Sequence, residues 1–156
     1  MERYEALQHA VKAHGKETDK CGVLAVLHPL AVARAIEDNM DPRSEWREDG
    51  AVVALLHDVL EDTDYDLPCR TLNVPQAAAL AAVTKLDDET YAEYIERIAT
   101  CEHRVAIIVK LADLWHNLSD TRQRCLPEGE AHGLEKRYLK ARARLWEALG
   151  QEWWPA

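Results

Sequence analysis

The chain of 156 residues contains 28 acidic residues against 19 Lys and Arg, a formal net charge of −9, and 47% of its residues are hydrophobic. The length suits one compact domain over residues 1–156, and the composition excludes a disordered chain. The negative charge argues against nucleic acid and anionic membranes as partners, so local cations must hold any anionic substrate.

Apolar residues recur at helical spacing in nearly every segment, and period-two alternation bounded by turn residues is absent. The sequence therefore predicts an all-α fold, a compact bundle of six to seven or more helices around a central site. Ser44 is a candidate N-cap for the third helix. In chain order the predicted spans are about 2–14, 28–38, 46–60, 75–84, 88–100, 102–124 and 134–149.

Features outside the helices bear on location and assembly. The N-terminal residues contain no apolar signal region, and no stretch reaches the ~18–20 apolar residues of a membrane span, so we expect a cytoplasmic protein. The tail GQEWWPA is interpreted as a cover for the core or a contact between copies, which leaves a homo-oligomer open. Four cysteines without a CxxC pair predict isolated buried thiols: Cys21, Cys69, Cys101 and Cys125.

The segment ALLHDVLEDTD, residues 54–64, places a histidine and several acids at the end of a hydrophobic helix. His57 and Asp58 are adjacent. Glu61 follows His57 by about one helical turn, and Asp62 follows Asp58 by the same distance. Gathering carboxylates in a partly buried place costs on the order of several kcal/mol unless a cation or protons neutralise them. The segment therefore predicts a site for a divalent metal.

A second segment, RVAIIVKLADLWHNLSD at residues 104–120, is almost wholly apolar around Asp113. A helix this apolar is central, so an uncompensated Asp113 would be costly, and metal ligation would remove that cost. Asn117 lies one turn later on the same face and could hydrogen-bond a ligand held there.

A third element is the end of the first predicted helix, where Lys12, Lys16 and Lys20 are spaced by four residues around His14. With this histidine the chain offers two imidazoles and two carboxylates, a set suited to Mn²⁺ or Fe²⁺, with Zn²⁺ also compatible. The candidate metal ligands are His14, His57, Asp58 and Asp113.

Each of these residues has a simpler interpretation when it is taken alone. His14 can be a helix C-cap, Asp113 can cap a short helix or pair with Lys110, and the lysines can form a solvated face. Five histidines are interpreted as structural or surface residues, with His28 capping a helix before Pro29. They are His9, His28, His103, His116 and His132.

In their order along the chain, these blocks resemble the HD-domain metal-dependent phosphohydrolases, specifically the hydrolase domain of Rel/SpoT-type proteins and small alarmone hydrolases. The resemblance covers about residues 4–122. The matching blocks are AH at 13–14, HP at 28–29, LLHDVLEDTD at 55–64, VTKL at 83–86, VKLAD at 109–113 and HN at 116–117.

The resemblance implies an all-helical HD domain that binds one Mn²⁺ through two histidines and two aspartates and removes the 3′-pyrophosphate from (p)ppGpp. Carried over by position, it implies the four candidate ligands given above. It implies that Glu61 and Asp62 orient or deprotonate the attacking water, and that Asn117 contacts the nucleotide sugar. We also expect Lys16 and Lys20 to bind this small phosphorylated nucleotide.

The chain departs from the family pattern around the expected substrate. Asp19 stands where relatives place an arginine that stacks on guanine, Ala25 replaces a common tyrosine, and Leu114 and Ser119 replace two arginines. Asp, Leu and Ser do not replace guanidinium stacking or bidentate phosphate contacts.

These departures leave other functions open beside a (p)ppGpp 3′-pyrophosphohydrolase. One alternative is an HD phosphatase for another nucleotide, of the 5′-nucleotidase or NADPH phosphatase type. Another is a nucleotide-binding module without catalysis. The water-activating pair favours an enzyme, because a binding module does not need it.

Overall fold

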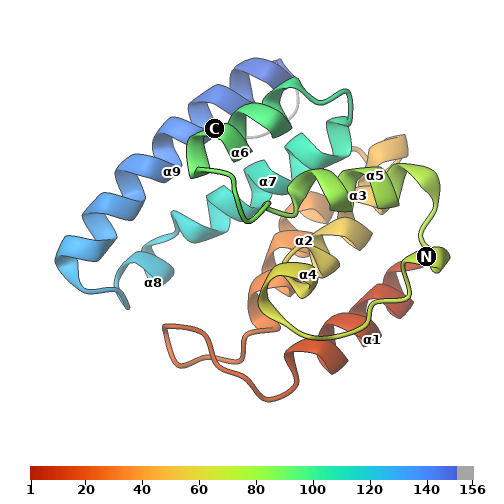
Figure 1. Cartoon of the computed structure of the whole chain (residues 1–156), viewed down its shortest axis with the longest axis horizontal. Helices are drawn as coiled ribbons and strands as arrows, with labels where there is room; N and C mark the ends of the chain where they lie inside the picture. Colours follow the sequence, from red (N-terminus) through yellow and green to blue (C-terminus); the bar gives the residue numbers. More distant parts are fainter. Residues whose placement is uncertain (151–156) are drawn as a thin grey trace.

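The computed structural model describes residues 1–150, which fold into helices joined by loops (Figure 1). Most of the aromatic tail, for which we expected a core cover or a contact between copies, lies outside these residues. The helices are α1 (Arg3–His14), α2 (Leu27–Asn39), α3 (Glu45–Leu56), α4 (Val59–Asp62), η1 (Cys69–Thr71), α5 (Val74–Val83), α6 (Tyr91–Thr100), α7 (Arg104–Asn117), α8 (Asp120–Gln123) and α9 (Glu128–Leu149).

The predicted all-α fold is confirmed, and local sequence signals explain several helix starts. The Ser44 hydroxyl accepts a hydrogen bond from the Trp46 backbone and caps α3, as expected. Asn73 and Thr90 begin α5 and α6 with capping boxes, in which the side chains of the cap and of the third helical residue bond each other's backbone N–H groups. Within residues 1–150 the extended pairing consists of one isolated bridge, between Thr18 and Leu24.

Two long predicted helices are each divided. The segment expected at 46–60 ends as α3 at Leu56 and resumes as α4, so His57 and Asp58 lie at the junction. The segment expected at 102–124 ends as α7 and resumes as α8 after Ser119, whose backbone is extended, with ψ at 144°. Both junctions place polar side chains at the ends of apolar helices.

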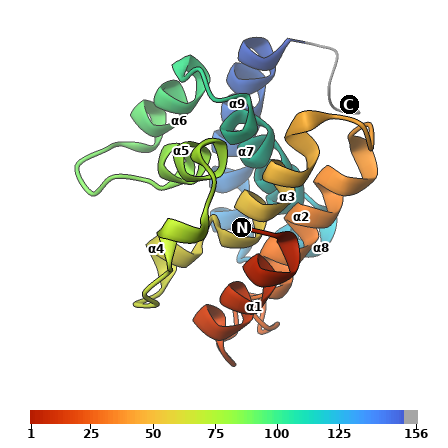
Figure 2. The ribbon, with the colours of Figure 1, turned by 90° about the vertical axis from the view of Figure 1, so that its right-hand side faces the viewer.

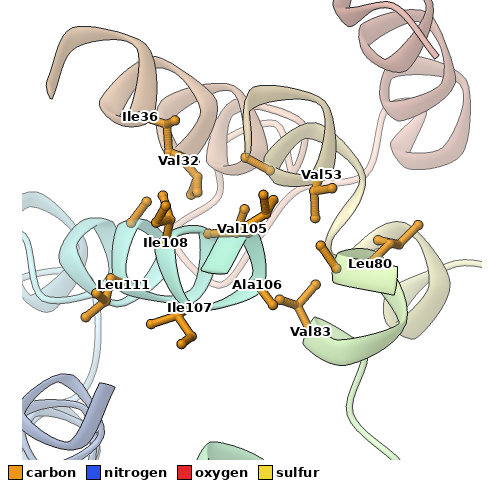
Figure 3. Packing of buried hydrophobic residues seen from close by; sticks show 14 of the residues in the cluster. Val32, Ile36, Val53, Leu80, Val83, Val105, Ala106, Ile107, Ile108 and Leu111 are labelled. Carbon is orange, nitrogen blue, oxygen red and sulfur yellow. The ribbon is translucent and has the colours of Figure 1, made fainter. Parts of the chain in front are cut away.

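The helix α7 forms the centre of the molecule. It packs against α2, α3, α5 and α9, and the ribbon shows it running between α3 and α9 (Figures 1 and 2). Its residues Val105 to Val109 are all buried, and the neighbouring helices surround them with aliphatic side chains such as Ile36 and Leu80 (Figure 3). This core holds the N-terminal half of α7 in place, and Asp113 follows in the C-terminal half of the same helix.

The cysteines differ from the sequence prediction. Cys21 and Cys125 form a disulfide with their Cα atoms 5.2 Å apart, although 104 positions separate them in the sequence. Cys69 is an exposed free thiol, and Cys101 is a partly buried one. The prediction of four isolated buried thiols is therefore wrong, because residue spacing does not show that the loop after α1 meets the segment after α8.

Over the described part of the chain, no helix has both the length and the apolar character to cross a membrane.

Candidate metal centre and adjoining cavity

Side chains from α2, the α3–α4 junction and α7 meet in one polar cluster. A nitrogen of His28, a nitrogen of His57 and an oxygen of Asp113 all lie within 4.8 Å of one another. His28 Nε2 lies 3.0 Å from Asp113 Oδ1 and 3.5 Å from Asp58 Oδ2. His57 Nε2 lies 3.0 Å from Asp58 Oδ1 and 3.8 Å from Asp113 Oδ1. Two imidazoles and two carboxylates therefore converge.

Hydrogen bonds on the far side of each ring orient the two histidines. His57 Nδ1 lies 2.7 Å from the carbonyl oxygen of Ala54, so this nitrogen carries the proton and Nε2 faces the carboxylates. His28 Nδ1 lies 2.7 Å from His116 Nδ1. Histidines that ligate metals are commonly held in this way through their second nitrogen.

The two histidines and two aspartates of the cluster have the chemistry of a metal site. His57 Nε2 is buried and has no hydrogen bond of acceptable geometry to any described residue, despite the nearby Asp58 oxygen. A buried polar atom without a partner is costly, and ligation of a cation would remove that cost. Two imidazole nitrogens with two carboxylates suit a divalent metal of intermediate softness.

Asp113 is kept ionised inside the apolar α7. Its Oδ2 accepts a hydrogen bond from Lys110 Nζ at 2.7 Å, and its Oδ1 accepts one from Asn117 Nδ2 at 2.5 Å. Burial alone would raise the pKa of Asp113, but Lys110 and the hydrogen-bonded His28 hold that pKa well below its usual value. Asp113 therefore forms the pair with Lys110 that the sequence left open as an alternative to metal binding. It also belongs to the polar cluster.

Glu61 and Asp62 lie on α4, directly beyond the cluster. Burial raises the pKa of both carboxyls, and the charge of Asp58 raises both further. Glu61 Oε1 accepts a hydrogen bond from the backbone of Lys85 at 2.7 Å. Asp62 lines the cavity described next, whereas Glu61 and Asp62 together line an adjoining acidic hollow.

A cavity of about 380 Å³ opens beside the cluster. Among the residues predicted for the site, His14, Lys20, Asp58, Asp62 and Asn117 line it, and exposed Lys16 does not. Apolar walls come from the segment after α8 and from α9. The lining consists of His14, Glu17, Thr18, Asp19, Lys20, Cys21, Ala25, His28, Asp58, Asp62, Asn117, Arg122, Gln123, Leu126, Leu134 and Tyr138.

The structure corrects the interpretation of His28 and gives His116 a specific structural role. His28 makes no capping bond at the start of α2, and it belongs to the cluster instead. His116, interpreted as structural or surface, supports His28 through the Nδ1 contact. The sequence marked His28 only through the HP block of the family resemblance, and the structure places this histidine at the second position of α2.

His14 has a different place from the one expected. It is buried and lines the cavity, and its Nε2 has no hydrogen-bond partner among the described residues, but it is not part of the 4.8 Å group.

Comparisons with known proteins give a consistent set of relatives. The chain is 32% identical over 137 residues to the guanosine-3′,5′-bis(diphosphate) 3′-pyrophosphohydrolase MESH1 of Danio rerio, with 80% of this chain and 71% of that protein covered. It is 33% identical over 122 residues to a guanosine-3′,5′-bis(diphosphate) 3′-pyrophosphohydrolase of Aquifex aeolicus, covering 72% of this chain. It is 30% identical over 127 residues to a GTP pyrophosphokinase of Streptomyces coelicolor, covering 75% of this chain. No protein-family model matches the sequence.

The two bacterial relatives are much longer, and the chain spans 17% of the Aquifex protein and 14% of the Streptomyces protein. A solved structure of a metazoan ortholog of SpoT that hydrolyses ppGpp superposes with a TM-score of 0.66 at 24% identity, with 94% of this chain and 84% of that chain covered. The all-helical architecture is therefore shared with that structure.

Proposed function

We propose that this chain, which belongs to the family of guanosine-3′,5′-bis(diphosphate) 3′-pyrophosphohydrolases, removes pyrophosphate from the 3′ position of (p)ppGpp. The observation that carries the proposal is the convergence of two histidines and two aspartates at the edge of a cavity large enough for a small nucleotide.

We propose His28, His57, Asp58 and Asp113 as the residues that hold the metal. This set replaces His14 with His28, because the His28 nitrogen faces both aspartates. Mn²⁺ is the expected ion, with Fe²⁺ and Zn²⁺ as alternatives for the same donors. When bound, such an ion supplies Lewis acidity, which neutralises charge on phosphate oxygens and makes water more acidic.

The chain's own residues supply the proton transfer. Asp62 lines the cavity beside Asp58, and burial raises its pKa; a carboxylate with a raised pKa is a better proton acceptor near neutral pH. Glu61, on the same helix, accepts a hydrogen bond from the backbone N–H of Lys85, and we assign it a supporting role in the proton transfer. Asn117 lines the cavity while it bonds Asp113, which is compatible with the sugar contact that the resemblance implies.

The activity is tested with purified protein loaded with Mn²⁺ and a panel of nucleotides, with pyrophosphate and orthophosphate measured separately. We expect pyrophosphate release from (p)ppGpp. Orthophosphate release from mononucleotides or NADPH, without pyrophosphate from (p)ppGpp, would support the alternative phosphatase. Nucleotide binding without turnover would support the binding module.

The ligand set is tested by metal content. His28→Ala and Asp113→Ala should lose bound Mn²⁺ and turnover, whereas His14→Ala should keep the metal, because His14 lies outside the 4.8 Å group. Loss of metal in His14→Ala with retention in His28→Ala would restore the ligand set expected from the sequence.

The proton acceptors are tested by isosteric variants. Glu61→Gln and Asp62→Asn should keep bound Mn²⁺ and lower kcat, by about 10²–10⁴-fold for Asp62→Asn, the residue that lines the cavity. Unchanged kcat in both variants, with metal content matched to the unmodified protein, would remove these carboxylates from the mechanism.

A cytoplasmic location stays a prediction. The disulfide between Cys21 and Cys125 weighs against it, because the reducing cytosol disfavours such bonds in most proteins. Formation of a homo-oligomer likewise stays a prediction.

A further inference from the structure

We infer that Arg122 binds a phosphate group of the nucleotide and that Asp19 positions its guanidinium in the cavity. The identity of the ligand rests on the proposed function, whereas the placement of the cation rests on the contacts described below. Neither residue was predicted to bind substrate.

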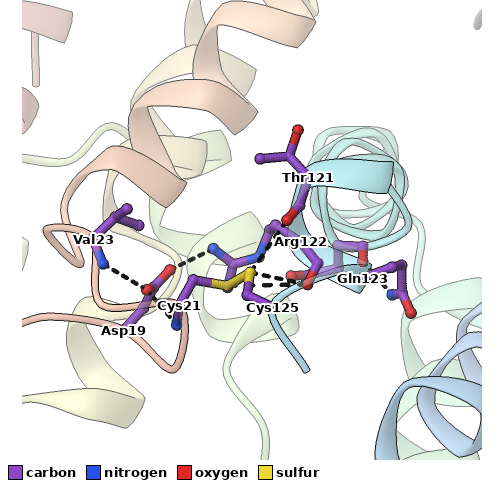
Figure 4. The surroundings of a disulfide bond; sticks show 8 residues. Asp19, Cys21, Val23, Thr121, Arg122, Gln123 and Cys125 are labelled. Carbon is purple, nitrogen blue, oxygen red and sulfur yellow. Dashed lines mark hydrogen bonds and ion pairs between the residues drawn. A yellow bond between two sulfur atoms is a disulfide. The ribbon is translucent and has the colours of Figure 1, made fainter. Parts of the chain in front are cut away.

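Arg122 lies on α8 and lines the cavity together with the cluster residues His28 and Asp58. Its Nη1 donates to Asp19 Oδ2 at 2.7 Å (Figure 4), and the side chains are 23% and 13% exposed. An ion pair this sheltered is better ordered than one on the open surface. Among the described residues, Asp19 is the partner of this guanidinium.

Asp19 is itself fixed by its loop. Its Oδ1 accepts hydrogen bonds from the backbone N–H groups of Cys21 at 2.8 Å and Val23 at 3.2 Å. The disulfide from Cys21 to Cys125 ties this loop to the segment that carries Arg122 (Figure 4). One oxygen of Asp19 is thus occupied by its own loop, and the other is aimed at Arg122.

The pairing leaves donors for a ligand. A guanidinium has five N–H donors, and one of them is used by Asp19. The planar fork of arginine matches the geometry of phosphate, and charge-assisted bonds of this kind are among the stronger hydrogen bonds in proteins.

The other cations near the cavity are less suited to this role. Lys20 also lines it, but its ammonium pairs with Glu130 and its side chain is 74% exposed. Lys110 does not line the cavity, and its ammonium pairs with Asp113. In a chain with a net charge of −9, a nucleotide needs a local cation, and Arg122 supplies one three positions after Ser119, where relatives are expected to have an arginine.

The decisive variant is Arg122→Gln, with Arg124→Gln as the matched control. Arg124 lies just beyond α8, is 81% exposed, pairs with Asp120 at the surface and is not part of the cavity lining, so the control makes the same change of charge away from the ligand. In the Mn²⁺-loaded protein, Arg122→Gln should raise KM for guanosine 3′,5′-bis(diphosphate) about 10- to 100-fold with kcat nearly unchanged. Arg124→Gln should match the unmodified protein, and Arg122→Lys should recover part of the loss.

A second measurement avoids turnover. Equilibrium dialysis of the same nucleotide with the full chain in the presence of a chelator should show the same loss of affinity in Arg122→Gln. If the unmodified protein binds in an Arg122-dependent manner but releases no pyrophosphate when loaded with Mn²⁺, the proposed function fails and this inference stands.

The positioning role of Asp19 is tested by a double-mutant cycle. Asp19→Asn keeps a side-chain oxygen for the loop but loses the charge, and it should raise KM by less than Arg122→Gln does. The double variant should be no weaker than Arg122→Gln alone, because Asp19 acts through Arg122. Additive losses would assign Asp19 a separate role.

Equal affinities of Arg122→Gln and Arg124→Gln, or no binding by the chelator-treated protein, would overturn the inference.

Discussion

Lys110 explains how α7 tolerates a charged aspartate among apolar residues. Its ammonium lies 2.7 Å from Asp113 Oδ2 and 5.0 Å from the centre of the Tyr94 ring. Burial alone would lower the pKa of Lys110, but the charge of Asp113 raises it well above its usual value, so both partners stay ionised. The pair thus directs one oxygen of Asp113 away from the histidines and leaves the other facing them.

Removing this cation should cost much of the stability of the fold. Lys110→Met leaves Asp113 buried without its ammonium, and breaking a buried pair by removing one partner typically costs about 3–5 kcal/mol. Urea denaturation in the presence of a chelator measures the loss. Arg34→Met is the control, because its pair with Asp38 is exposed and should contribute less than about 1 kcal/mol. Equal losses in the two variants would show that the buried pair is not what holds Asp113.

Single residues of the site could be predicted only in part from the sequence. Asp113 stood out because a lone acid in an apolar helix needs compensation, and His57 and Asp58 stood out because acids gather beside them. His28 was misinterpreted, because a histidine at the start of a helix has an ordinary capping explanation. Its role depends on the meeting of α2 with α7, which no local pattern reports.

Whole helices were predicted more reliably than their ends. Hydrophobic periodicity located the segments that pack around α7, since burial of an apolar face depends mainly on local pattern. The interruptions after Leu56 and Asn117 were missed, because the residues around both breaks are compatible with a continuous helix. His57 and Asp58 lie at the first break, and Arg122 lies on α8, just after the second.

The long helix α9 completes the cavity wall, and its docking is testable. Leu145 is fully buried, whereas Leu139 on the same helix is 41% exposed. Leu145→Ala should therefore lower the free energy of unfolding by about 2–5 kcal/mol, and Leu139→Ala by less than about 1 kcal/mol. Chemical denaturation of both variants measures the difference. A small loss at Leu145 would mean that α9 contributes little to the core.

At the scale of the whole molecule, the site depends on segments that lie far apart in the chain. The loop after α1 meets three parts of the C-terminal region. Asp19 pairs with Arg122 on α8, Cys21 forms the disulfide with Cys125 after α8, and Lys20 pairs with Glu130 in the first turn of α9. Composition and spacing could not predict this meeting, because cysteines at such a separation have no local signature. The cavity is closed on one side by these long-range links.

The disulfide should stabilise the molecule as a whole. Because it joins residues 104 positions apart, it restricts the unfolded chain strongly, and its loss should lower the free energy of unfolding by about 2–5 kcal/mol. Urea denaturation with and without dithiothreitol, repeated on Cys125→Ser, measures this effect. Cys69→Ser is the control, because Cys69 is an exposed free thiol. Its replacement should not shift the urea denaturation curve, either with or without dithiothreitol. Thiol titration of the denatured, unreduced protein should detect Cys69 and Cys101 but neither Cys21 nor Cys125, and titration of all four cysteines would show that the bond does not form.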